Sequence, residues 1–159
     1  MAVLAADVHI PHLGNPTKVP VRVAGADEFY AGACIFAVVA TGYAVCLPAA
    51  STPFLGICTR HFTTTAAGDY IEIWVNGVFK FPVLTAAIAI GSMGDMVICD
   101  ATAAGTLTDN VKDYVVDKVA TLAATDILIG QIVGLNADGT TYVQLKTNTG
   151  VANALGFGG

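Results

Sequence analysis

Charged residues are scarce in this chain of 159 residues. There are seven Lys and Arg and twelve Asp and Glu, so charged residues make up 12% of the sequence, against a usual share of roughly 25%. The seven basic residues are scattered, and the clustered cations that bind nucleic-acid phosphates are missing. With a net charge of −5, the surface would also be repelled by anionic lipid. We therefore expect neither nucleic acid nor a membrane as a partner.

The sequence also lacks the common signatures of catalysis and metal binding. No cysteine pair has CxxC spacing, the three histidines form no ligand pattern with the four cysteines, and no GxxxxGK[ST] loop is present. Asp residues fall mostly at strand ends and turns, where they cap backbone groups. A nucleophile built from Cys58 and His61 would need both side chains exposed beside an orienting carboxylate. We expect no enzyme, no cofactor, and no catalytic or metal-binding residue.

The cysteines have the surroundings of buried thiols. Cys34, Cys46 and Cys58 lie among apolar neighbours, where free cysteine packs as a small hydrophobic side chain. The start, MAVLAADVHI, lacks the basic region and sustained apolar run of a secretory signal, which favours reduced thiols and synthesis in a cytoplasm. The uncharged stretch 29–58 is long enough to span a membrane, but glycines and prolines interrupt it at strand-length intervals.

The clearest structural signal is the alternation in residues 70–83, YIEIWVNGVFKFPV. One parity is apolar and would face a core, whereas the other carries Glu72, Asn76 and Lys80 and would face water. The apolar set is Ile71, Ile73, Val75, Phe79, Phe81 and Val83. Asn76-Gly77 lies at the midpoint, and Asn-Gly is a strong signal for a two-residue hairpin turn. The pattern predicts two antiparallel strands paired across that turn.

The whole chain is predicted to be all-β with minor α content. Strands are expected near 19–24, 33–39, 43–47, 54–59, 70–75, 78–83, 95–99, 113–118, 127–135 and 141–147. Asp138-Gly139 predicts a second hairpin, between the last two of these strands. The segments 85–91 and 117–126 are rich in Ala and could each form a short helix.

The two ends differ from this central domain, which we expect to span residues 29–147. Residues 1–28 contain three prolines and show no helical period, so they are expected to form an extended arm held out of regular structure. Residues 148–159, NTGVANALGFGG, are uncharged and rich in Gly, which predicts a flexible tail.

Residues 29–147 resemble small bacteriophage head-decoration proteins, also called capsid cement proteins. The resemblance lies in a pattern of glycines and strand residues. It comprises Ala31-Gly32, Leu55-Gly56-Ile57-Cys58, Gly68-Asp69 through Gly77-Val78-Phe79, GDMVICDATAAGTLTD at 94–109, and ILIGQIVGLNADGTTYVQLKT at 127–147. The chain departs from this pattern in its N-terminal arm, in residues 110–126 and in its tail.

The resemblance implies a compact β-barrel or β-tulip domain that binds the outer surface of a phage capsid and stabilises the shell. The implied partners are the major capsid protein and further copies of this chain, as a homotrimer. Several weak contacts in one trimer would add through effective concentration. The chain would be made in the host cytoplasm and reside in the virion. Alternatives are another virion component (a head-fibre base, a minor capsid or a tail protein) or a small β-barrel ligand-binding module.

The N-terminal arm is the segment expected to contact the capsid. It is extended, and an extended segment can pair with a strand edge of a partner while alternate side chains fill pockets. We expect the arm to be mobile when free and fixed when bound. The residues predicted to make the contact are Val3, Val8, Ile10, Pro11, His12, Leu13, Val19 and Val21.

Overall fold

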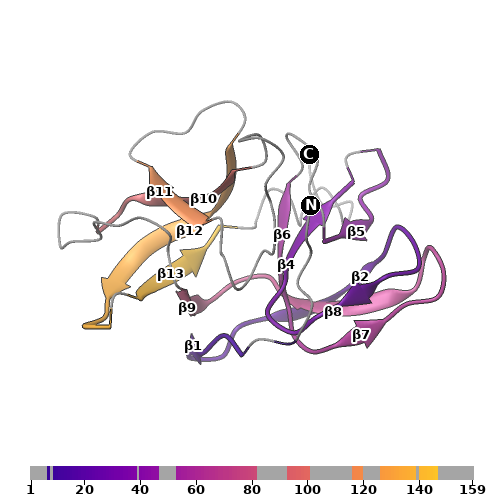
Figure 1. Cartoon of the computed structure of the whole chain (residues 1–159), viewed down its shortest axis with the longest axis horizontal. Helices are drawn as coiled ribbons and strands as arrows, with labels where there is room; N and C mark the ends of the chain where they lie inside the picture. The colour runs from indigo at the N-terminus through magenta and orange to yellow at the C-terminus, as the bar shows by residue number, and fades with distance from the viewer. Residues whose placement is uncertain are drawn as a thin grey trace.

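A computed structural model describes residues 7, 9–38, 40–46, 53–81, 93–100, 116–119, 126–138 and 140–146, except for the side chains of 98–100, 116–119 and 126. The described residues contain thirteen strands and no helix, and every pairing between strands is antiparallel (Figure 1). The prediction of an all-β fold is confirmed. A closed barrel is not shown, because the described strands form three sheets.

The largest sheet has six strands, in the order β1-β9-β13-β12-β10-β11. Their bounds are β1 (His12–Leu13), β9 (Val78–Phe81), β10 (Met96–Asp100), β11 (Val116–Val119), β12 (Asp126–Leu135) and β13 (Thr141–Leu145). The second sheet has five strands, in the order β2-β8-β6-β4-β5. These are β2 (Lys18–Arg22), β4 (Cys34–Ala37), β5 (Ala44–Val45), β6 (Phe54–Cys58) and β8 (Tyr70–Trp74). A small third sheet pairs β3 (Glu28–Phe29) with β7 (Phe62–Thr63).

Each of the ten predicted strands overlaps a strand of the structure, and β12 and β13 pair with each other as the second predicted hairpin requires. The three strands that were not predicted, β1, β3 and β7, have two residues each, too few to show alternation. The helix expected over 117–126 is wrong at its start, where β11 pairs with β10. The helix expected over 85–91 lies outside the described residues.

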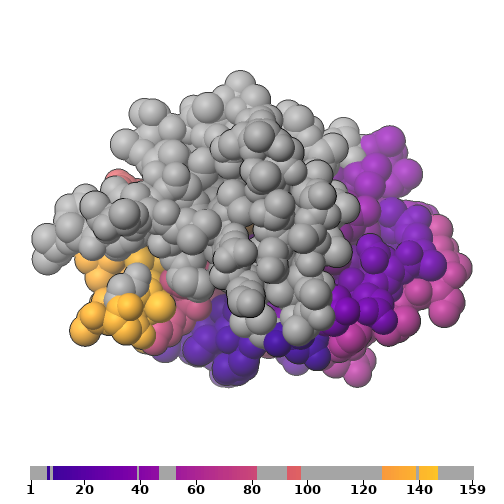
Figure 2. All heavy atoms as spheres, viewed as in Figure 1, coloured from indigo at the N-terminus to yellow at the C-terminus, as the bar shows by residue number. Residues whose placement is uncertain are grey.

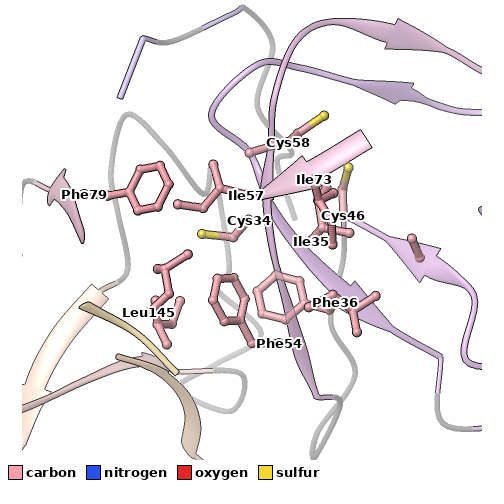
Figure 3. Packing of buried hydrophobic residues seen from close by; sticks show 14 of the residues in the cluster. Cys34, Ile35, Phe36, Cys46, Phe54, Ile57, Cys58, Ile73, Phe79 and Leu145 are labelled. Atoms are coloured by element: carbon pink, nitrogen blue, oxygen red, sulfur yellow. The ribbon is translucent and has the colours of Figure 1, made fainter. Parts of the chain in front are cut away.

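One apolar core joins the two large sheets. Figure 3 shows Phe79 and Leu145 of the six-stranded sheet facing Cys34, Phe54 and Ile57 of the five-stranded sheet. The predicted parity of 70–83 is confirmed where it is described, since Ile71, Ile73, Phe79 and Phe81 are at most 1% exposed. The uncharged stretch that begins at residue 29 supplies core strands β4, β5 and β6. Among the described residues, no helix is long and apolar enough to cross a membrane.

The predicted hairpin at Asn76-Gly77 is wrong, because β8 and β9 do not pair with each other. β8 pairs with β2 and β6, whereas β9 pairs with β1 and β13, so the chain crosses from one sheet to the other at this point. The Asn76 side chain instead holds the N-terminal segment: its Oδ1 accepts a hydrogen bond from the Thr17 backbone N–H at 2.7 Å. Gly77 has φ +116°, and a Cβ here would lie 2.9 Å from the Cβ of Pro16. Asn76-Gly77 therefore lies where the chain crosses between the two sheets, and not in a hairpin turn.

The N-terminal segment is also more regular than predicted. β1 pairs with β9 and β2 pairs with β8, so these parts of residues 1–28 belong to the two large sheets. Pro20 fits into β2 because β2 is an edge strand. The N–H of Val23 donates to the backbone carbonyl of Asp69, and the carbonyl of Thr17 accepts from the N–H of Val75. Odd-numbered residues of this segment therefore direct their backbone groups toward β8. Pro20 lies on the other parity, and its missing N–H falls on the open edge.

Candidate functional site

The structure separates the eight residues predicted for partner contact into buried and exposed members. The side chains of Ile10 and Val21 belong to the core, with 4% and 5% exposure, and Val19 is half-buried against it. Pro11, His12 and Leu13 are exposed and consecutive. Val3 and Val8 lie outside the described residues. Of the predicted contact residues that the structure describes, those fully exposed to a partner are therefore Pro11–Leu13, which we call the N-terminal strip.

The N-terminal strip is fixed to the domain by its backbone and by one ring. The Lys80 N–H donates to the carbonyl of Pro11 at 2.8 Å, and His12 and Leu13 lie opposite Phe79 and Val78 in the sheet register. The His12 ring lies 5.2 Å from the ring of Trp74 and 5.7 Å from that of Phe79, measured between centroids. These contacts hold the strip at a junction of the two large sheets, because Trp74 ends β8 and Phe79 belongs to β9.

Leu13 is the apolar member of the N-terminal strip that points to solvent, with 52% of its surface exposed. In the space-filling view, the N-terminal residues in indigo lie at the surface along the lower rim of the molecule (Figure 2). β1 is the first strand in the order of its sheet, so its outer edge carries no described strand. The strip thus combines a fixed backbone with an exposed leucine side chain.

A hollow of about 280 Å³ lies next to the strip. It is lined by Asp7, His9, Ile10, Ala31, Gly32, Thr59 and Trp74. The Asp7 carboxylate accepts a hydrogen bond from the Ala31 backbone N–H at 2.9 Å and lies 3.5 Å from Nδ1 of His61. Asp7 thus binds the start of the described chain to the segment between β3 and β4, and the hollow lies between this segment, Thr59 and Trp74.

The candidate nucleophile Cys58 is unsuited to chemistry in this structure. Its side chain is fully buried, its Sγ donates to the carbonyl of Arg60 at 3.1 Å, and burial raises the pKa of the thiol to about 12. A thiol with that pKa is protonated at neutral pH and is a poor nucleophile. His61 contacts other groups: its ring lies 4.6 Å from the ring of Tyr30, between centroids, and Nδ1 faces Asp7.

The cysteines with described side chains are core residues. Cys34, Cys46 and Cys58 are free and buried, which confirms their predicted burial. Burial also raises the pKa of the Cys34 thiol to about 12. The side chain of Cys99 lies outside the described residues. In the described ranges, no group of three or more His, Cys, Asp or Glu side chains is placed to hold a metal ion.

The comparison with protein families agrees with the resemblance found in the sequence. The family model described as phage cement protein matches residues 35–116, just over half of the chain. The match runs from the core strand β4 to the first residue of β11. No curated protein and no solved structure matches this chain. The predicted resemblance is confirmed, and the chain belongs to the phage cement proteins, a family of structural proteins of the virion capsid.

Proposed function

We propose that this protein binds the outer surface of an assembled phage capsid and stabilises the shell, acting as a homotrimer made in the host cytoplasm. The family match supports a role on the capsid. The observation that carries the proposed contact is the N-terminal strip, in which a fixed backbone presents Leu13 with 52% of its surface exposed. Its partner is the major capsid protein.

A fixed strip would bind with less entropic loss than a free arm. The backbone of Pro11–Leu13 is already ordered by β9 and by the rings of Trp74 and Phe79. Ordering one residue costs about 1–2 kcal/mol, and this cost is met during folding rather than during capsid binding. Full burial of a leucine side chain contributes about 1.5–3 kcal/mol. In a trimer, three such contacts would act together through effective concentration.

Sedimentation of the purified protein with expanded, empty capsids tests the proposal. The wild-type chain should pellet with capsids, and Leu13→Ser should weaken binding by about tenfold per contact, since about 1.4 kcal/mol corresponds to tenfold. Val133→Ser is the matched control, because Val133 on β12 is also apolar and 41% exposed. Both changes are at exposed positions, and melting curves should show that both variants remain folded.

Two outcomes would contradict the proposal. A wild-type chain that does not pellet with capsids would refute capsid binding itself. A Leu13→Ser variant that binds as well as the wild type, with Val133→Ser unchanged, would show that the N-terminal strip is not the contact.

A further inference from the structure

A second surface hollow, of about 240 Å³, brings together one arginine and two tyrosines. It is lined by Pro20, Val21, Arg22, Thr41, Gly42, Tyr43 and Tyr70. Tyr70 is the most exposed large apolar side chain among the described residues, at 55%. We call Arg22, Tyr43 and Tyr70 the arginine–tyrosine cluster.

Three segments far apart in the sequence converge to form this cluster. Arg22 and Tyr70 lie directly opposite each other in the register of β2 and β8, so their side chains are neighbours on one face. Tyr43 comes from the turn between β4 and β5, where Gly42 adopts φ +70°. That turn is held beside the end of β2, because the Ala24 N–H donates to the carbonyl of Ala44 at 3.1 Å.

The two phenols hold the Arg22 side chain in place but do not use all of its donors. The Nε of Arg22 donates to the Tyr70 hydroxyl at 2.9 Å, and the guanidinium carbon lies 5.2 Å from the centroid of the Tyr70 ring. Hydrogen bonds with Tyr70 and then Tyr43 raise the pKa of Arg22. A guanidinium has five N–H donors in a rigid fork, so further donors remain for another acceptor.

Arg22 also lacks a carboxylate partner among the described residues. Lys18 pairs with Glu72 at 3.5 Å and Lys80 pairs with Asp138 at 2.9 Å, but no described carboxylate lies within ion-pair distance of Arg22. The Arg22 guanidinium is thus held by a phenol and not by a carboxylate, on a chain with a net charge of −5. Arg and Tyr are also the residue types most enriched at the energetic centres of protein interfaces.

We propose that the arginine–tyrosine cluster receives the carboxylate of an Asp or Glu side chain presented by the major capsid protein. The Arg22 fork binds the carboxylate through charge-assisted hydrogen bonds, and the Tyr70 ring shields the pair from water. This inference rests on the proposed function and names the chemistry of a second contact. The occupant is an acidic partner because the site supplies positive charge and free N–H donors.

Two measurements test this inference. In the first, the isolated protein is titrated with glutarate, and with neutral glutaramide as the control probe, while NMR follows the Arg22 Nε–Hε and the Tyr43 and Tyr70 rings. Glutarate should shift these signals and glutaramide should not. In the second, sedimentation measures binding to capsids. Arg22→Gln should lower the affinity for capsids by about thirtyfold per contact and make that affinity less dependent on salt.

Arg60→Gln is the matched control in the capsid experiment. Arg60 is also exposed and forms no described ion pair, and its guanidinium carbon lies 4.6 Å from the centroid of the Phe62 ring. Arg60→Gln should bind as the wild type does. Arg22→Lys should fall between the wild type and Arg22→Gln, because lysine keeps the charge but not the fork.

The outcomes separate this inference from the proposed function. If the wild type binds capsids and Arg22→Gln binds equally well, the inference is overturned and the proposed function stands. If glutarate causes no shift, the carboxylate site is overturned as well. If Arg22→Gln instead dissociates the trimer, the cluster belongs to an interface between copies and the capsid assignment is wrong. If the wild type does not bind capsids, the proposed function and the capsid carboxylate fail together.

Discussion

Replacement of Gly56 by alanine should disrupt the centre of the five-stranded sheet. Gly56 lies in β6, and a Cβ built on it would lie 2.1 Å from the backbone oxygen of Trp74 and 3.3 Å from the Cδ1 of Ile73. The first contact is with backbone, so no rotation of a side chain can relieve it. β6 and β8 would have to separate locally, although they pair through Ile57 with Trp74 and Cys58 with Ile73.

The expected cost of Gly56→Ala is large for a single methyl group. Overpacking a core costs about 1–3 kcal/mol, and the upper end applies here because strand backbones must move. For a domain of this size, about 3 kcal/mol lowers the Tm by about 6–12 °C. Calorimetry or thermal circular dichroism would measure this fall in Tm. The control is Gly25→Ala, because a Cβ at Gly25 meets no atom within 4 Å. Melting temperatures of the two variants within about 2 °C of each other would contradict a steric clash at Gly56.

Three further predictions concern the core, the thiols and the assembly. Ile73→Asp should unfold the domain because it buries an unpaired carboxylate, whereas Glu72→Ala, at a half-buried position that pairs with Lys18, should change the free energy of unfolding by under about 1 kcal/mol; equal losses in urea titrations would contradict the assigned faces. Burial raises the pKa of the Cys34 and Cys58 thiols to about 12, so the unfolded chain loses their protons first as pH rises. The contribution of the two buried thiols to the free energy of unfolding should be complete below about pH 8.5. Above that pH it should decline by about 1.4 kcal/mol per pH unit for each thiol, until the pH reaches the pKa of the folded state. A free energy of unfolding that stays constant between pH 8 and 10 would argue against this. Light scattering should give a mass of about 49 kDa, three copies of the 16.2 kDa chain; a mass of one chain at high concentration would count against a trimer in solution.

The strands could be predicted from the sequence because alternation of apolar and polar residues is a local property. The partners of those strands depend on contacts between distant residues. Asn76-Gly77 has the local chemistry of a hairpin turn, but Asn76 binds Thr17 and the Gly77 carbonyl accepts from the Leu145 N–H at 3.0 Å. These contacts place β8 and β9 in different sheets, and no local pattern contains that information.

The candidate contact surfaces also depend on contacts between distant residues, which a local sequence pattern does not contain. Prolines in residues 1–28 predict an extended arm, but the sequence does not reveal that Ile10 and Val21 enter the core while Leu13 stays exposed. The arginine–tyrosine cluster could not be predicted, because the pairing of Arg22 with Tyr70 depends on the register of β2 and β8. The division of the chain at residues 28 and 147 remains a prediction.

Cryo-electron microscopy of expanded capsids decorated with the wild-type protein would show whether the protein binds the outer surface of the shell through its N-terminal strip. We predict density for three copies on the outer surface of the shell, with Pro11–Leu13 of each copy against the major capsid protein. Density inside the shell, or a trimer bound with its N-terminal strip facing solvent, would contradict it.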